Sequence, residues 1–192
     1  TARFEAVSFL MAAATHGGGP ADALVRTRTL LEERGQELHA GFTVRMPSNY
    51  IIGSNPVSGA QAETVFAQAE ADIDAMLLAL ATGDIHAPTT RGWAARLKTN
   101  WGHDRYTASL PAADRKFRVD EACTSCGICT MVCPVDNISL GEDKRPVWHH
   151  QCEYCLGCLH LCPVQAIQAS ALTRRRRRYL HPQVRRSDLM NR

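Results

Sequence analysis

Two stretches decide the fold: CTSCGICTMVCP at residues 123–134 and CEYCLGCLHLCP at residues 152–163. In each, three cysteines are separated by two-residue spacers, and a fourth follows after three further residues, directly before a proline. The likeness continues past the cysteines as Cys-Pro-Val-x-x-Ile, at residues 133–138 and again at 162–167. The two stretches therefore look like copies of one unit. All 8 cysteines of the 192-residue chain lie within them.

This cysteine spacing is the bacterial-type ligand pattern for two [4Fe-4S] clusters. A cubane needs one thiolate on each of four irons, and a loop with two-residue spacers can wrap three cysteines around three of its corners. The fourth corner faces away from that loop and is reached by the last cysteine of the other stretch, after which the proline turns the chain out of the site. The pattern therefore predicts one cluster on Cys123, Cys126, Cys129 and Cys162, and a second on Cys152, Cys155, Cys158 and Cys133.

Zinc and disulfides are the alternatives for the cysteines. Zinc normally takes two Cys-x-x-Cys pairs separated by a longer stretch, so three closely spaced cysteines followed by Cys-Pro leave a surplus for a tetrahedral site. Disulfides belong to exported proteins, and nothing at the start of the chain resembles a signal peptide. His149, His150 and His160 stand beside the cysteines without replacing any, and we expect them to be surface or hydrogen-bonding residues rather than ligands.

Short apolar segments flank the cysteine stretches, where hairpin strands would close over the clusters: Phe117–Val119, Ile138–Leu140, Pro146–His149 and Ile167–Ala169. With these segments and the repeated motif, residues 117–171 resemble bacterial two-cluster ferredoxins. The resemblance implies one-electron transfer at low potential, with the cluster sulfurs tuned by backbone N–H groups.

The N-terminal half alternates strands and helices. An apolar run at residues 7–14 predicts a strand covered on both faces, followed by the loop His16-Gly-Gly-Gly-Pro20 and a helix over residues 21–34. Residues 38–46 alternate as a half-buried strand does, and a helix capped by Ser58 runs to Gly83. This order favours an α/β layer with a parallel sheet. Residues 85–116 form a connector whose Trp93, Leu97 and Trp101 share a helix face. We expect this face to pack onto one of the domains rather than to contact a cofactor or a membrane.

The glycine loop, followed by Met46-Pro-Ser-Asn-Tyr50 and a ferredoxin module, resembles the second half of the flavodoxin-like domain in flavodoxin/ferredoxin fusion proteins. The resemblance covers residues 1–84 and implies FMN at the sheet edge, bordered by Thr15, His16, Gly17, Gly18 and Gly19, with Tyr50 either stacked on the flavin or packed as an ordinary ring. The strand and loop that hold the FMN phosphate in that family are absent. Because the chain also begins at Thr1 rather than Met, we expect a fragment whose full-length protein binds FMN.

The charge is uneven along the chain. Residues 173–192 carry eight arginines and one acid, Asp188, whereas residues 117–172 carry three basic and six acidic residues. Because blocks of like charge repel, residues 172–192 read as a disordered basic tail. The tail could also dock onto an acidic redox partner or fold back over the acidic ferredoxin module. Binding to nucleic acid or an anionic membrane is the least favoured interpretation, because no nucleic-acid motif accompanies the arginines.

The predicted fold class is α/β plus α+β: a partial flavodoxin-like parallel-sheet segment followed by a two-[4Fe-4S] ferredoxin module. No apolar run approaches the roughly 18 residues of a membrane span, so we expect a cytoplasmic protein without integral membrane association. The predicted function is intracellular electron transfer, with a redox partner protein and, in the full-length protein, a flavin as a two-to-one-electron adaptor. The alternative is an iron-sulfur subunit that wires the active site of a larger oxidoreductase. No residue outside the clusters looks catalytic.

Overall fold

The computed structural model describes residues 7–88 and 102–190, which fall into two compact units. The first unit is drawn from Thr1–Ser48 and Val57–Asn100, and the second from Asn49–Pro56 and Trp101–Arg192. The second unit thus takes a short segment from the middle of the N-terminal half. The connector face at Trp93, Leu97 and Trp101 lies outside the described residues.

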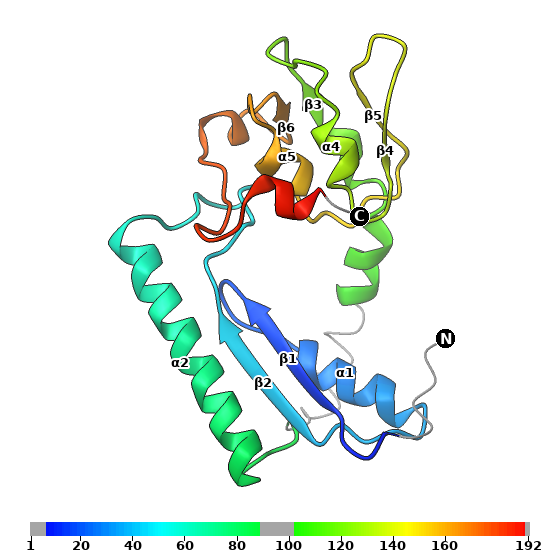
Figure 1. Cartoon of the computed structure of the whole chain (residues 1–192). Coiled ribbons are helices and arrows are strands. Elements are labelled where there is room, and N and C mark those ends of the chain that lie inside the picture. Colours follow the sequence, from blue (N-terminus) through cyan, green and yellow to red (C-terminus); the bar gives the residue numbers. More distant parts are fainter. Residues whose placement is uncertain (1–6, 89–101, 191–192) are drawn as a thin grey trace. The chain divides into compact units, whose positions relative to one another are not determined.

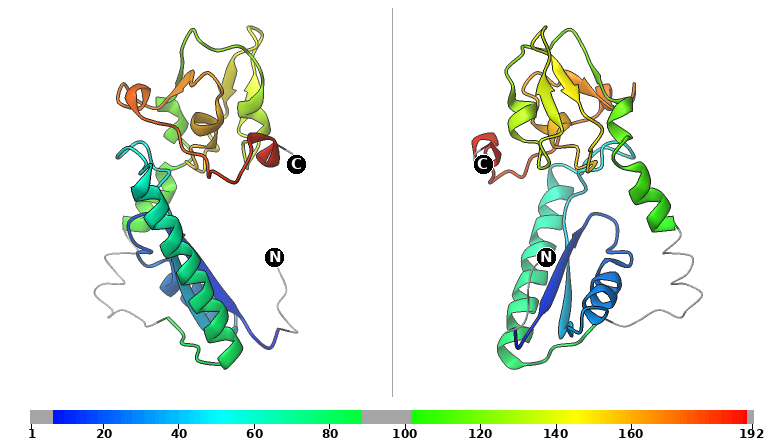
Figure 2. Two further views of the ribbon diagram at one scale, coloured as in Figure 1. Left: turned by 60° about the vertical axis from the view of Figure 1, so that its left-hand side comes forward. Right: turned by 90° about the vertical axis from the view of Figure 1, so that its right-hand side faces the viewer.

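The first unit is a parallel strand pair with a helix after each strand (Figure 1). Strands β1 and β2 pair in parallel from Met11↔Ala40 to His16↔Arg45. Helix α1 lies beside β1 and α2 beside β2, on either side of the pair (Figure 2). The predicted order of strand, helix, strand and helix is confirmed, with these bounds: β1 Met11–His16, α1 Ala23–Glu32, β2 Ala40–Arg45 and α2 Ala60–Thr82.

Two local expectations for this unit were wrong. The first strand runs over Met11–His16 rather than residues 7–14, and alternate residues of it are exposed instead of covered on both faces, because its sheet has only two strands among the described residues. Helix α2 has Gly59, not Ser58, as its N-cap. The predicted C-terminal end at Gly83 is confirmed: its φ of 75° is a left-handed conformation that glycine adopts without strain.

The second unit is built from short strands and single-turn helices around the cysteines. All four predicted flanking strands are present, as two antiparallel pairs, β3 with β6 and β4 with β5. Residues 102–109 are helical and precede the first pair. The elements are η1 Ala113–Lys116, β3 Arg118–Val119, α4 Ile128–Met131, β4 Ile138–Leu140, β5 Pro146–Trp148, α5 Gly157–Leu161, β6 Ile167–Gln168, η2 Thr173–Arg175 and η3 Arg186–Leu189.

The core of the second unit includes a residue from far earlier in the chain. Ile51 is fully buried and packs in one cluster with Phe117, Leu159 and Ile167. Beside it, the Tyr50 ring meets Tyr154 edge-on, with 6.0 Å between centroids. The segment Asn49–Pro56 is therefore a structural part of the cysteine-rich unit, which the predicted boundary at residue 117 leaves out.

The arginine-rich segment is folded against this unit, which differs from the expected disordered tail. The Arg176 guanidinium donates to the backbone oxygens of Ile51 at 2.6 Å and Ile52 at 2.5 Å. Arg177 donates to Pro56 O at 3.0 Å, and Arg178 to Ile167 O at 2.9 Å. Like charges can lie together here because each of these three guanidinium groups donates to at least one backbone carbonyl. Of the three interpretations of the tail, the fold-back onto the ferredoxin module agrees with these contacts.

None of the helices in the described residues is both long and apolar enough to cross a membrane.

Candidate metal centre

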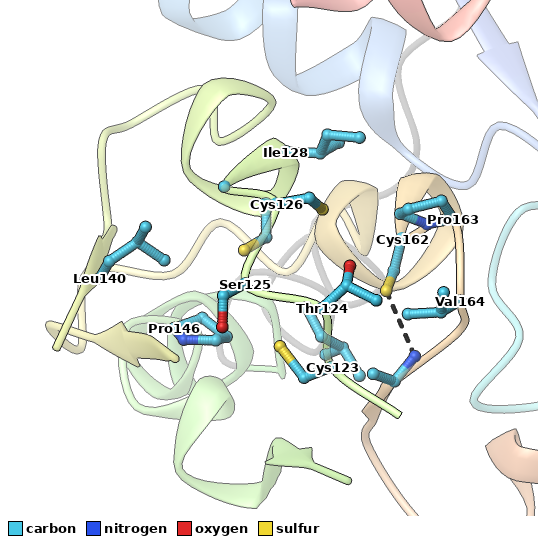
Figure 3. A pocket seen from close by; sticks show the side chains of 14 residues that line it. Cys123, Thr124, Ser125, Cys126, Ile128, Leu140, Pro146, Cys162, Pro163 and Val164 are labelled. Atoms are coloured by element: carbon cyan, nitrogen blue, oxygen red, sulfur yellow. Dashed lines mark hydrogen bonds between the residues drawn. The ribbon is translucent and has the colours of Figure 1, made fainter. Parts of the chain in front are cut away.

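The first cysteine cavity takes residues from both stretches of the motif. Cys123, Cys126 and Cys129 come from the first stretch and Cys162 from the second, and all four line the cavity (Figure 3). The wall between them is mostly apolar, with Ile128, Leu140, Pro146, Val164 and Ile167.

The second cavity has the converse composition. Cys152, Cys155 and Cys158 from the second stretch line it together with Cys133 from the first. Its wall carries two large aromatic side chains, Phe117 and Trp148. The structure thus brings the eight predicted ligands together in the two crossed sets that the spacing predicts.

The two copies fold alike down to single backbone angles. Three pairs of equivalent residues, 29 positions apart, all have a positive φ, which only a minority of non-glycine residues adopt. The pairs are Ser125 (56°) with Tyr154 (53°), Gly127 (73°) with Leu156 (60°), and Asp136 (50°) with Gln165 (51°). The repeat is therefore structural, and these turns aim the cysteines of both copies in the same way.

Backbone N–H groups point at the cysteine sulfurs. Asn137 N donates to Cys133 Sγ and Ala166 N to Cys162 Sγ, both at 3.2 Å and at equivalent positions of the repeat. Tyr154 N donates to Cys152 Sγ at 3.2 Å. Such donors stabilise negative charge on sulfur, as a thiolate bound to iron requires.

Burial opposes free thiolates in both cavities. It raises the pKa of the Cys129 thiol to about 11 and lifts the pKa values of Cys152 and Cys158 above their usual range. None of the eight cysteines forms a disulfide. A bound cation is what would favour deprotonation at such sites, and the apolar wall with several thiols and N–H donors fits an iron-sulfur cluster.

Within residues 7–88 and 102–190, no group of three or more His, Cys, Asp or Glu side chains could hold a single metal ion. A [4Fe-4S] cluster differs from such a site. In a cubane each thiolate binds a different iron, so the four sulfurs stand around a void rather than around a point.

The three histidines beside the motif all make hydrogen bonds, as expected. His149 Nε2 lies 2.9 Å from Ser139 Oγ, and His150 Nδ1 lies 2.6 Å from Asp114 Oδ1. His160 is buried and bridges two segments: its Nε2 lies 2.7 Å from Asn49 O, and its Nδ1 accepts from Tyr179 N at 2.9 Å. These contacts fix His160 as the neutral Nε2–H form, and burial lowers its pKa in the same sense.

Two polar networks around the cavities were not predicted from the sequence. The buried Asp114 carboxylate accepts from Asn137 Nδ2 at 2.8 Å and from His150 N at 3.1 Å, and Asn137 Oδ1 accepts from Gln151 N at 2.7 Å. This network holds β4 against the turn that leads into the second cysteine stretch. Asp114 lies in the predicted connector, and in the sequence it is a lone acid between two alanines and two basic residues.

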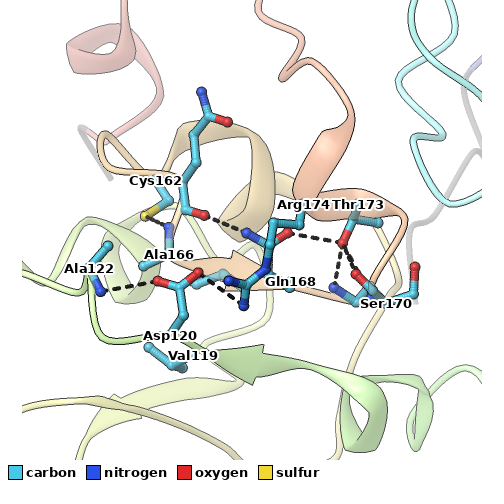
Figure 4. A network of polar contacts seen from close by, with 12 residues as sticks. Val119, Asp120, Ala122, Cys162, Ala166, Gln168, Ser170, Thr173 and Arg174 are labelled. Carbon is cyan, nitrogen blue, oxygen red and sulfur yellow. Dashed lines mark hydrogen bonds and ion pairs between the residues drawn. The ribbon is translucent and has the colours of Figure 1, made fainter.

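The second network joins the arginine-rich segment to β6 (Figure 4). Thr173, fully buried, accepts from Ala169 N at 3.1 Å and donates toward Gln168 Oε1 at 3.0 Å. Arg174 reaches Asp120 at 3.6 Å, and Asp120 also accepts from Ala122 N at 3.1 Å, just before Cys123. The network positions the loop that enters the first cavity.

The predicted flavin loop, Thr15 to Gly19, consists of the last two residues of β1 and the three glycines that follow them. Met46 N donates to His16 O at 2.9 Å, so the ends of β1 and β2 stay joined. A Cβ on Gly17 would stand 2.6 Å from the Ser48 Cβ, whereas one on Gly18 would meet nothing within 4 Å. Gly17 is thus needed for the close approach of Ser48.

Comparison with known proteins agrees with this site. The family of 4Fe-4S binding domains matches residues 118–139. The site and this match define this part of the chain as a 4Fe-4S binding domain. Over 66 residues it is 32% identical to a ferredoxin of Pyrobaculum islandicum, covering 33% of this chain and 61% of that protein. It is also 34% identical over 57 residues to Ferredoxin-3 of Chlorobaculum tepidum, covering 27% of this chain and 92% of that protein. The chain therefore belongs to the ferredoxin family. No solved structure matches it.

Proposed function

We propose that the chain binds two [4Fe-4S] clusters and passes electrons between them one at a time. The observation that carries this proposal is the crossed cysteine arrangement, in which each cavity takes three cysteines from one stretch and the fourth from the other. A bound [4Fe-4S] cluster takes up and releases single electrons. The chain holds the two sites on interlocked loops, excludes water with apolar walls and directs N–H groups at the sulfurs.

The crossed arrangement gives a direct test. An anaerobically purified protein with two clusters contains about eight irons per chain. If Cys126 and Cys162 serve the same cluster, the double variant Cys126→Ala/Cys162→Ala loses only that cluster and keeps about four irons. The matched double variant Cys155→Ala/Cys162→Ala damages both clusters and keeps far fewer. The reverse order would refute the crossed arrangement, and zinc without acid-labile sulfide in the unmutated protein would refute the clusters.

A flavin is the second component of the proposal, for the full-length protein. Its support is the parallel β1–β2 pair, whose carboxyl ends meet at the glycine loop, where open α/β sheets bind ligands. The buried Nδ1 of His16 in this loop has no hydrogen-bond partner among the described residues and could serve a ligand. Fluorescence titration of the product of the complete gene with FMN tests this: we expect binding that Gly17→Ala weakens and Gly18→Ala leaves intact. No binding would refute it.

We propose that the redox partner is a protein. It is either a separate protein that accepts electrons from this chain or the other subunits of a larger oxidoreductase. Exposed apolar side chains surround the first cavity: Leu140 and Val164 line it and are each 40% exposed. Leu140→Ser should slow electron delivery to a protein acceptor such as a cytochrome, while delivery to a small dye stays unchanged. Equal rates for the variant and the unmutated chain with both acceptors would refute docking at this rim.

A further inference from the structure

The walls of the two cavities differ in their polar side chains: Thr124 and Ser125 line the first, whereas Asn137, Glu153 and Trp148 line the second. The backbone donors to sulfur are duplicated by the repeat, since Asn137 N and Ala166 N stand at equivalent positions. The second cavity has in addition the indole of Trp148, four residues before Cys152. The residue four before Cys123 is Val119, which has no polar side-chain atom. Among the residues that line the first cavity in the described structure, no side chain carries an N–H group.

The indole of Trp148 is held firmly in place. Trp148 ends strand β5 and pairs with Ile138 across the hairpin. Its ring meets Phe117 edge-on, with 5.8 Å between centroids and an interplanar angle of 81°. Phe117 is itself buried and stacks on Tyr154. The indole therefore has little freedom to turn its N–H away from the cavity.

The Trp148 Nε1–H group is buried and has no hydrogen-bond partner among the described residues. Native proteins rarely leave a buried N–H unpaired, because the group loses its hydration without compensation. Trp148 and Cys158 line the same cavity, so the Cys158 sulfur is the acceptor on that wall to which we assign the indole. An acceptor with more negative charge than a thiol, such as a cluster-bound thiolate, would satisfy it.

We propose that Trp148 Nε1–H donates a hydrogen bond to the Cys158 sulfur of the second cluster and raises the reduction potential of that cluster. The inference rests on the two-cluster function proposed above. One electron entering a cluster adds one negative charge, which spreads over its sulfurs, and a hydrogen bond to a sulfur stabilises that charge. The first cluster, with Val119 at the equivalent position, lacks this donor.

The test combines potentials with a spectroscopic readout. In a redox titration followed by electron paramagnetic resonance, Trp148→Phe should lower the equilibrium constant for reducing the second cluster about tenfold, a shift of about 59 mV for a one-electron couple. The first cluster should not move. Phe117→Leu is the control, because it changes the aromatic wall of the same cavity and removes no N–H group. An equal shift in Phe117→Leu, or none in Trp148→Phe, would overturn the inference.

A second measurement uses the unmutated chain and so does not depend on the variant folding. In protein grown with indole-¹⁵N tryptophan, the reduced second cluster should show hyperfine coupling to a tryptophan nitrogen. Absence of that coupling would overturn the inference even if Trp148→Phe does not fold. Counts of iron and acid-labile sulfide distinguish failure of this inference from failure of the two-cluster function. A protein with about eight irons per chain but no coupling would retain the two-cluster function and refute only the role of Trp148.

Discussion

Replacing Ile51 by alanine should loosen the cysteine-rich unit, although Ile51 lies 72 residues before Cys123 in the sequence. Its side chain is fully buried among Phe117, Leu159 and Ile167. Truncating a fully buried isoleucine costs about 2–5 kcal/mol of folding free energy. If half of that loss appears in the unfolding barrier, unfolding accelerates by about 5- to 70-fold.

The assay is the bleaching rate of the visible iron-sulfur absorbance in a fixed concentration of guanidinium chloride under anaerobic conditions. A rate is the right quantity because cluster loss makes unfolding irreversible. Ile73→Ala is the matched control: Ile73 lies on α2 in the other unit and is 39% exposed. Bleaching of Ile51→Ala at the rate of Ile73→Ala would refute the assignment of Asn49–Pro56 to the ferredoxin core.

Three further substitutions test neighbouring contacts. Arg176→Ala removes the donors to Ile51 O and Ile52 O and should lower the free energy of unfolding by about 1.5–3 kcal/mol. Arg175 is an exposed neighbour, and Arg175→Ala should be nearly neutral in the same bleaching assay. Equal effects of the two variants would favour a solvated tail. His160→Phe leaves Asn49 O and Tyr179 N without their partner and should speed bleaching. The iron content after anaerobic purification should stay unchanged, because we expect His160 to be a hydrogen-bonding residue and not a ligand. Loss of iron would contradict this expectation. Gly17→Ala should lower the thermal stability of the first unit by about 1–3 kcal/mol through its clash with Ser48, and calorimetry should find Gly18→Ala close to the unmutated chain; the opposite ranking would refute the close approach.

The sequence predicted best what depends on local spacing. The repeated cysteine motif led to the crossed sets and the four flanking strands, because ligand geometry and chain reversal leave few alternatives over so short a distance. It could not predict that Ile51 enters this core, since a single apolar residue after a strand has no periodic signal for a partner so far away. The expectation of a disordered arginine-rich tail rests on the repulsion among its charges. It leaves out the backbone carbonyls to which Arg176, Arg177 and Arg178 donate in the folded chain.

The positions at which the two copies differ explain why the second copy holds the extra segments. In the second copy, Tyr154 packs against Tyr50, and Leu156 joins the core that contains Ile51. The His160 ring forms a hydrogen bond with Asn49 O. The equivalent residues of the first copy are Ser125, Gly127 and Met131, and Met131 is 44% exposed. Leu156 even keeps a left-handed φ of 60°, which the equivalent Gly127 adopts without strain, and burial of its side chain to 2% exposure offsets that cost. The repeat thus supplies two sites of one geometry, and the substitutions in the second copy bind the Asn49–Pro56 segment while the first copy keeps its rim open.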